Sequence, residues 1–437
     1  MRLLLTLSLF LTLPSVLLAV SPLSQPMRTT PLSPSIHTIR TSLSLDDDPN
    51  GKRHDLPVLR LGSDDRLTVS FDHLDATLDN LYYTVVRCDA DWRPSSLSFS
   101  EWGEGYYSNP VEYADVSVNT LQSYVHYATS FPNDDLRFRL SGNYAVFFHP
   151  FDAPDMPLAC VCFCVTEQAA SVSGSVTADT HREIKGAWQE LSFDVSVPSL
   201  SIQNPDNELK VFVQQNDRPD TRVQLRPTFI EGPSRYRYFN TDSLLFEGGR
   251  EYRYIDISSP YSFSGEVERV IRGGGAASPD SVHTVVVLPS TPSPRAPYLW
   301  QYDLNGRFIV NVQEYDNDDL TADYCRVRFM LRTPSPFFDG RVYLLGGWNN
   351  NRLDERSRMI YNVKHEAYVA DILLKQGGYN FLYALLPQGS SRASFRRTEG
   401  SHWQTENQYD VYVYYRAFGE RSDRLLTVRT FSSSFDK

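Results

Sequence analysis

The sequence has few cysteines, few lysines and little long apolar sequence, and each scarcity excludes a class of protein. Five cysteines among 437 residues are too few for a disulfide-rich scaffold. Lysine occurs six times against 36 arginines, and the 53 acidic residues outnumber the 42 basic ones, which gives a formal net charge of −11. Such a chain lacks the basic surface that non-specific binding to nucleic acid or anionic lipid requires. We therefore expect no nucleic-acid partner and no direct insertion into lipid.

The one long apolar run stands at the start of the chain. Arg2 precedes the uncharged segment 3–19, which contains Pro14 and, at about 17 residues, is short for a transmembrane helix of about 20. These features are typical of a secretory signal peptide that is cleaved near Ala19. We expect residues 1–19 to be removed from an exported chain, with a membrane anchor as the alternative.

The pattern of the cysteines indicates buried side chains in a core and not a metal site. Three of them alternate and would share one face of a strand, whereas zinc sites commonly use Cys-x-x-Cys turns. We interpret all five as small buried side chains, and their disulfide pairing stays open. They are Cys88, Cys160, Cys162, Cys164 and Cys325.

Motifs for catalysis and for metal binding are also missing. The nine histidines are scattered without a His-Glu-x-x-His, and no Gly-x-Ser-x-Gly occurs. The acidic run 316–319 lacks the glycine and the distal glutamate of an EF-hand loop, so calcium is only a minor alternative there. We predict that the protein is not an enzyme, with no catalytic residue, no cofactor and no metal.

What the sequence does contain is a period of two. Apolar and polar residues alternate in segments such as 66–71, 81–86, 191–197 and 409–415, and no helical stripe of comparable length occurs. Short strands with frequent turns favour β-sandwiches. The sequence therefore predicts an all-β protein.

Two composition changes divide this pattern. A polar, small-residue stretch at 167–174 resembles a junction, and the proline-rich segment 289–297 resembles a stiff linker. We predict three consecutive immunoglobulin-like or early-set-like β-sandwich domains after the signal peptide, at 36–167, 171–289 and 297–434. Arranged in a row, they would form an elongated rod.

Aromatic residues in turn-like surroundings are the candidates for partner binding. Trp92 and Trp102 lie in such segments, and Tyr106 follows closely. Two interpretations compete. These side chains close the edge of the core beneath long loops, or they are anchors at an interface, where tryptophan, tyrosine and arginine dominate the binding energy. We name Trp92, Trp102 and Tyr106 as the partner-binding candidates.

Short motifs along nearly the whole mature chain carry a resemblance to a known family. They occur at 56–63, 82–95 (with Cys-Asp-Ala-Asp-Trp at 88–92), 140–144, 213–216, 246–252, 302–306 and 399–407. In this order they resemble the type IX secretion system plug proteins of Bacteroidota. One departure is Arg87, where the family commonly has histidine.

The resemblance implies a non-enzymatic plug that occludes the periplasmic opening of the giant outer-membrane β-barrel translocon. The protein would lie in the periplasm at the inner face of the outer membrane, as a monomer with the translocon as its partner. A soluble stack of sandwiches suits this role because the lumen of a wide barrel is polar and aqueous.

The C-terminal domain also resembles early-set immunoglobulin-like domains, which include glycogen-binding modules. The resemblance rests on the segments 342–351 and 376–383. Where sugar-binding modules carry a stacking tryptophan after paired asparagines, this chain has Asn351. A carbohydrate-binding protein of the outer membrane or periplasm is therefore the alternative function, and loss of glycan binding in Trp348→Ala would support it.

Overall fold

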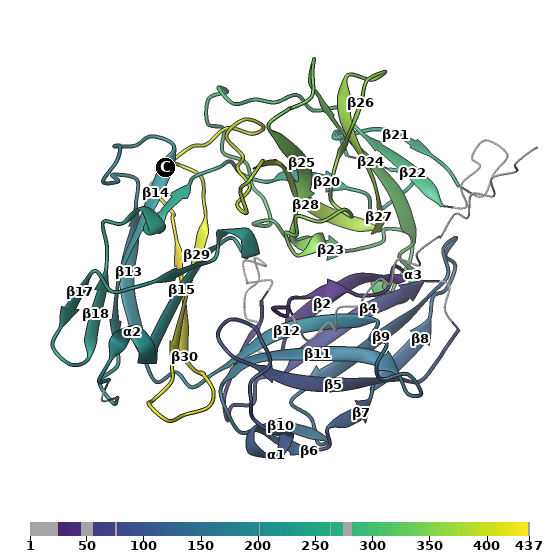
Figure 1. Ribbon diagram of the computed structural model, residues 1–437. Helices are drawn as coiled ribbons and strands as arrows, with labels where there is room; N and C mark the ends of the chain where they lie inside the picture. Colours follow the sequence, from purple (N-terminus) through teal and green to yellow (C-terminus); the bar gives the residue numbers. More distant parts are fainter. Residues whose placement is uncertain are drawn as a thin grey trace, which may run out of the picture.

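A computed structural model describes residues 25–44, 56–74, 77–200, 202–262, 264–273 and 282–435. The predicted signal peptide, residues 1–19, lies outside the described residues. The all-β prediction is confirmed, because strands dominate and each α-helix in these ranges has only four residues. Within the same ranges no helix is both long and apolar enough to cross a membrane. The strands group into three sandwich units around a common centre (Figure 1).

The first unit packs two antiparallel sheets face to face. One sheet has the order β1-β12-β11-β5-β7, with β3 alongside β12 in parallel, and the other has the order β2-β4-β9-β8. Along β5 the residues Leu81, Tyr83 and Val85 are buried and alternate with half-buried ones, as a strand with one face on the core requires. The elements are β1 (Thr30–Pro31), β2 (Ile36–Leu43), β3 (Val58–Arg60), β4 (Leu67–Leu74), β5 (Leu81–Cys88), α1 (Phe99–Trp102), β6 (Gly103–Gly105), β7 (Ser108–Pro110), β8 (Tyr113–Val116), β9 (Tyr124–Phe131), β10 (Leu136–Phe138), β11 (Gly142–Pro150) and β12 (Ala159–Thr166).

The second unit combines strands from the middle and the end of the chain. One sheet has the order β13-β14-β18-β17, with β19 beside β14, and the other has the order β16-β15-β29-β30. Leu191, Phe193 and Val195 of β14 point into the core between them. The elements are β13 (Ser171–Thr177), β14 (Trp188–Ser196), α2 (Pro205–Glu208), β15 (Leu209–Gln215), η2 (Pro219–Thr221), β16 (Val223–Leu225), β17 (Phe229–Glu231), β18 (Arg235–Tyr238), η3 (Asp242–Leu244), β19 (Leu245–Glu247), β29 (Gln408–Tyr415) and β30 (Arg424–Ser432).

The third unit contains the longest strand, β28, at the centre of one sheet. That strand pairs with β20, β23 and β25, and the opposite sheet has the order β21-β22-β24-β27-β26. The elements are β20 (Arg253–Asp256), β21 (Val267–Ile271), β22 (His283–Val287), β23 (Phe308–Val310), α3 (Asp318–Thr321), β24 (Tyr324–Arg332), β25 (Gly340–Leu345), η4 (Gly347–Asn349), β26 (Ile360–Asn362), β27 (Ala367–Lys375) and β28 (Gly377–Pro387).

The sheets divide the chain differently from the predicted ranges 171–289 and 297–434. Strands β20 and β22 pair with β28 and β24, so they belong to the third unit. Strand β29 pairs with β15 along its length, from Leu209 opposite Tyr415 to Gln215 opposite Tyr409, so the last two strands complete the second unit. An alternating pattern predicts a strand but does not say which strand lies beside it.

Two further expectations were wrong. The proline-rich segment 289–297 is not a free linker, because Ser290 exchanges backbone hydrogen bonds with Met330 and Arg332 of the third unit. The units also do not form a rod. The first unit contacts the third as well as the second, and the three surround a common centre (Figure 1).

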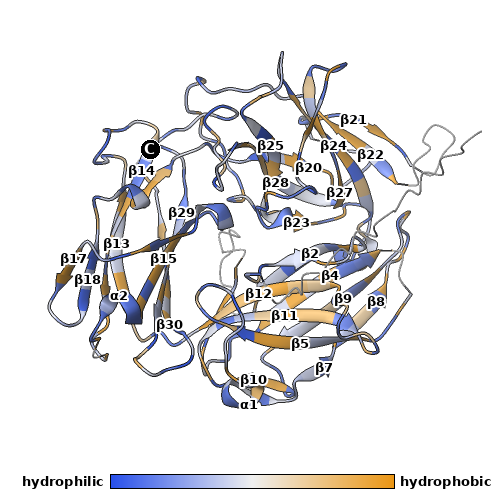
Figure 2. Ribbon diagram, viewed as in Figure 1, coloured by the Kyte–Doolittle hydropathy of each residue, from blue (hydrophilic) through white to orange (hydrophobic). Residues whose placement is uncertain are grey.

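Strand β12 explains how the first unit is joined to the second. Its residues Val161, Phe163 and Val165 face the core of the first unit, while Cys160, Cys162 and Cys164 face a cluster that includes Tyr412 and Leu425 of the second unit. Figure 2 shows the apolar character of strands β12, β11 and β5, which lie side by side in one sheet of the first unit. The prediction that the three cysteines share one face is confirmed, and all five cysteines are buried and free.

Candidate functional site

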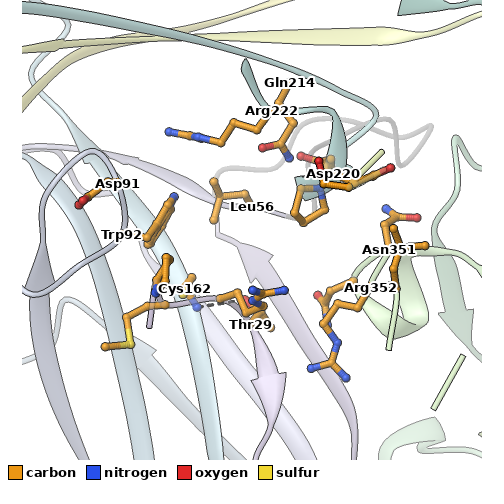
Figure 3. Close-up of a pocket in the computed structure, with 18 residues that line it drawn as sticks. Thr29, Leu56, Asp91, Trp92, Cys162, Gln214, Asp220, Arg222, Asn351 and Arg352 are labelled. Carbon is orange, nitrogen blue, oxygen red and sulfur yellow. Dashed lines mark hydrogen bonds between the residues drawn. The ribbon is translucent and has the colours of Figure 1, made fainter. Parts of the chain in front are cut away.

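A cavity of about 480 Å³ lies where the three units meet (Figure 3). Each unit contributes part of its wall. The first supplies Pro26, Met27, Arg28, Thr29, Leu56, Asp91, Trp92 and Cys162, the second supplies Gln214, Asp217, Pro219, Asp220 and Arg222, and the third supplies Asn350, Asn351, Arg352, Leu353 and Ser391.

The wall from the first unit is ordered by the turn that follows β5. The backbone N–H of Trp92 donates to Asp89 at 2.9 Å, and Trp92 adopts a positive φ of 63°. Its carbonyl accepts from the N–H of Met27 at 2.8 Å, and Thr29 Oγ1 accepts from the N–H of Cys162 at 3.0 Å. These bonds hold the segment before β1 against β12 and against the turn after β5, so the apolar floor of the cavity is fixed.

The wall from the second unit is built on an arginine held by aromatic rings. The Arg222 guanidinium lies 4.3 Å from the Phe212 ring centroid and 5.0 Å from that of Tyr412. It also donates to the carbonyl of Ala90 at 3.2 Å, which ties the second unit to the turn of the first. Stacking on two rings leaves the guanidinium pre-organised rather than free to rotate.

The wall from the third unit is a turn with two left-handed residues. Asn350 and Asn351 have φ of 53° and 50°, a conformation that asparagine adopts more readily than other non-glycine residues. Asn351 is 3% exposed, and its Oδ1 has no hydrogen-bond partner among the described residues. The buried amide therefore presents an unused polar atom at the edge of the cavity.

Buried polar contacts lock the units around this cavity. Between the first and third units, Lys375 Nζ lies 2.7 Å from the Asp72 carboxylate, which also accepts from Tyr324 OH at 2.7 Å. Burial alone would raise the pKa of Asp72. The positive charge of Lys375 and the hydrogen bond from His126 outweigh burial and lower this pKa. The carboxylate is thus held in its charged form.

The contact between the first and second units centres on Asp423. Its carboxylate accepts from the backbone N–H of Ala90 at 2.9 Å, from Lys210 Nζ at 2.9 Å and from Arg416 Nε at 2.8 Å. The carbonyl of Asp423 accepts from Arg87 Nη2 at 2.6 Å. The Cys-Asp-Ala-Asp-Trp motif at 88–92 therefore docks the two units onto each other.

The contact between the second and third units uses a buried ion pair. Arg218 Nη2 lies 2.7 Å from Asp220 and donates to the carbonyl of Ala393 at 2.9 Å, while the N–H of Ala393 donates to Asp220 at 2.9 Å. The guanidinium also lies 4.5 Å from the centroid of Phe395. Since all three contacts combine buried charge with hydrogen bonds, the units form one body.

The predicted partner-binding residues fall into two groups. Trp92 and Trp102 are buried, at 9% and 3% exposure, and Trp102 packs edge to face against Phe99 and Tyr144. Tyr106 is 69% exposed. It follows Gly105, where a Cβ would lie 2.0 Å from the carbonyl oxygen of Asp135, so glycine allows the two backbones to approach each other closely there. Burial favours the interpretation in which the two tryptophans close the edge of the core, and partner binding by Tyr106 stays a prediction.

Reactive groups are few at the cavity. Cys162 lines it, but burial and the neighbouring Cys160 raise the pKa of its thiol, which disfavours the thiolate nucleophile. In the described part of the chain, no three His, Cys, Asp or Glu side chains come together as a metal site requires. No pattern in the sequence predicts the cavity, because its walls come from separate segments spread along the chain between Pro26 and Ser391.

The fold and its junctions define a class: an all-β protein of three mutually locked sandwich units. A family model described as the first domain of the type 9 secretion system plug protein matches residues 38–167. The chain belongs to the type IX secretion system plug protein family and so has a role in that secretion system.

A solved structure supports the fold over nearly the whole chain. It is that of a hypothetical protein from Parabacteroides merdae, which is 33% identical, with a TM-score of 0.87. The match covers 93% of this chain and 99% of that one. No curated protein matches the chain.

Proposed function

We propose that the protein is a non-enzymatic plug, which occludes the periplasmic opening of the outer-membrane β-barrel translocon of the type IX secretion system. The observation that carries this proposal, beside the family, is the locking of three sandwich units by buried polar contacts at every junction. A stopper must fill space and resist deformation, and packed β-sandwiches joined in this way do both.

The polar character of the body also favours this role. The chain has a net charge of −11, and a plug that works in an aqueous lumen must stay off the lipid. Closure must also be reversible, which favours a polar, non-obligate interface with the barrel. Tyr106 and its neighbour Tyr107, 69% and 54% exposed, are the contact residues that we propose on the first unit.

The alternative, a carbohydrate-binding protein, lacks a comparable observation. Trp348 is half-buried and packs against the core of the third unit, and Asn349 and Asn351 are buried. A pyranose ring needs an open aromatic face on which to stack. The motif at 342–351 therefore accounts better for the turn after β25 than for a sugar platform.

The experiment that tests the proposal is affinity capture from detergent-solubilised outer membranes with the tagged mature protein. We expect one very large β-barrel to co-purify, in a salt-sensitive manner because charges at the rim of an interface are screened. A deletion strain should in addition become permeable to large antibiotics. Unchanged permeability together with retention on polysaccharide alone would favour the carbohydrate-binding alternative.

A further inference from the structure

A second cavity, of about 340 Å³, adjoins the central one. Asn350 and Arg352 line both cavities, so the two meet at the turn after β25. The second cavity lies between the first and third units. Four consecutive residues of β2, 36–39, and five consecutive residues of β27, 371–375, form its sides.

Consecutive lining residues show that the cavity faces the edges of two sheets. Side chains of a strand alternate between its faces, so a cavity above a sheet contacts every second residue, whereas one at an edge contacts successive residues. Strand β2 is the outermost of its sheet, and β27 pairs with β26 only over Ala367–Val369. Within the described residues, the remainder of β27 has a strand neighbour on one side only.

A free strand edge is a template for an extended chain, since it presents backbone N–H and C=O groups in register. Here two edges from different units border one space: that of β27 and that of β2, which has a bulge between His37 and Arg40. A small rounded ligand would not use that arrangement, whereas an extended polypeptide segment could hydrogen-bond along it.

Arginines gather where the two cavities meet. Arg352 is 8% exposed and pairs with Asp354 at 2.8 Å, yet its Nε has no hydrogen-bond partner among the described residues. Burial lowers the pKa of Arg352; Asp354 opposes this effect, and the nearby charges of Arg356 and Arg28 add to it. Clustered like charges destabilise one another unless an anion joins them.

Four carboxylates line the two cavities, and three of them already pair with an arginine. Asp371 pairs with Arg328 at 2.7 Å, and Asp91 pairs with Arg93 at 3.1 Å. Asp220 pairs with Arg218 at 2.7 Å. These three are thus compensated by arginines that line neither cavity. Two acidic side chains remain, Asp217 in the central cavity and Asp354 beside Arg352, and they are outnumbered by the lining arginines Arg28, Arg222, Arg352 and Arg356.

We propose that the two cavities form one groove that binds an extended, acidic polypeptide segment of a partner protein between the edges of β2 and β27. Carboxylates of the segment contact Arg28, Arg352 and Arg356, and its apolar side chains lie against Trp348 and Leu353. This inference goes beyond the plug role, because the groove would bind such a segment without the barrel.

The test uses the full mature chain and fluorescein-labelled eight-residue peptides that alternate valine with aspartate, with lysine or with serine. Fluorescence anisotropy should show tighter binding of the aspartate peptide, weakening as salt rises. In Arg28→Gln/Arg356→Gln, which changes only exposed arginines, we expect the affinity to fall about tenfold. The matched control is Arg137→Gln/Arg139→Gln, whose exposed arginines lie elsewhere on the first unit, and it should change affinity less than twofold.

A photo-crosslinking version of the aspartate peptide locates the site by mass spectrometry. Crosslinks to β2, to β27 or to the turn at 346–352 would support the proposal. Equal affinities for the three peptides, equal effects of the two double variants, or crosslinks confined to other surfaces would overturn it. Arginine-dependent binding of dextran sulfate without peptide binding would also overturn it, in favour of an anionic polysaccharide.

Discussion

The ammonium group of Lys375 and the carboxylate of Asp72 form an ion pair of 2.7 Å between the third and the first unit, and both side chains are at most 1% exposed. In the sequence, strands β13–β19 of the second unit separate the first unit from the third, so no short linker connects the two units that this ion pair joins. The pair also contacts Tyr124, whose ring centroid lies 4.2 Å from Nζ. This buried contact is one of those that close the three units around the central cavity.

Removal of one partner of this pair should be costly. Lys375→Met leaves a buried carboxylate without its cation, and we expect the free energy of unfolding to fall by about 3–5 kcal/mol. Urea denaturation of the mature protein measures this. The double variant Asp72→Asn/Lys375→Met should recover part of the loss. The control Arg328→Gln breaks a partly exposed pair with Asp371 and should cost less than about 1 kcal/mol.

Stability should fall at acid pH. Burial alone would raise the pKa values of Asp72 and Glu167. The neighbouring cations outweigh this effect, because Lys375 lowers the pKa of Asp72 and Arg424 lowers that of Glu167. Each carboxyl has a lower pKa in the folded state than in the unfolded chain, so the unfolded chain binds more protons in acid. The contribution of the two carboxylates to the free energy of unfolding is therefore complete above about pH 4, and it is lost as the pH falls through their folded-state pKa values. Urea midpoints between pH 7 and pH 3 check this, and Asp72→Asn should flatten the curve. A midpoint that rises towards pH 3 would contradict the assignment.

The junction of the first and second units should depend on Asp423. In Asp423→Ala, Lys210 and Arg416 lose their shared carboxylate and the N–H of Ala90 loses its acceptor, so we expect a loss of about 3–5 kcal/mol. Hydrogen exchange should accelerate selectively in the turn at 89–92. Asp152→Asn, at an exposed loop position, is the control and should leave both measurements unchanged. Equal exchange in the two variants would show that the carboxylate does not hold the turn.

Tyr106 and Trp102 should separate partner binding from stability. Trp102→Ala removes a ring from the core of the first unit, so we expect about 3–5 kcal/mol of destabilisation. Tyr106→Ala removes an exposed ring and should leave the melting temperature unchanged while weakening capture of the translocon. Full capture by Tyr106→Ala would remove this residue from the interface.

The strands could be predicted from the sequence, but their partners could not. The alternation in 66–71 and 191–197 corresponds to β4 and β14, because one face of each lies on a core. The alternation of Tyr409–Tyr415 is the same whether β29 pairs within the third unit or, as it does, with β15. Register and neighbour are set by packing between segments far apart in the chain.

The same reason explains which site residues could be predicted. The turn-like surroundings of Trp92 make it a candidate from the sequence alone, and it lines the central cavity. Arg222 and Arg352 carry no local motif, and the motif that contains Asn351 indicates a turn and not a cavity. Only closure of the three units brings these residues to one cavity. Buried pairs such as Lys375 and Asp72, which are 303 residues apart, are likewise invisible in a sequence window.

The most direct test of the plug role is the conductance of the purified translocon in a planar lipid bilayer, measured before and after the mature protein is added to the periplasmic side. The plug account predicts a large open conductance that falls in discrete steps to near zero, with a smaller effect of Tyr106→Ala at equal concentration. An unchanged conductance, with the complex shown by co-purification to have formed, would contradict it.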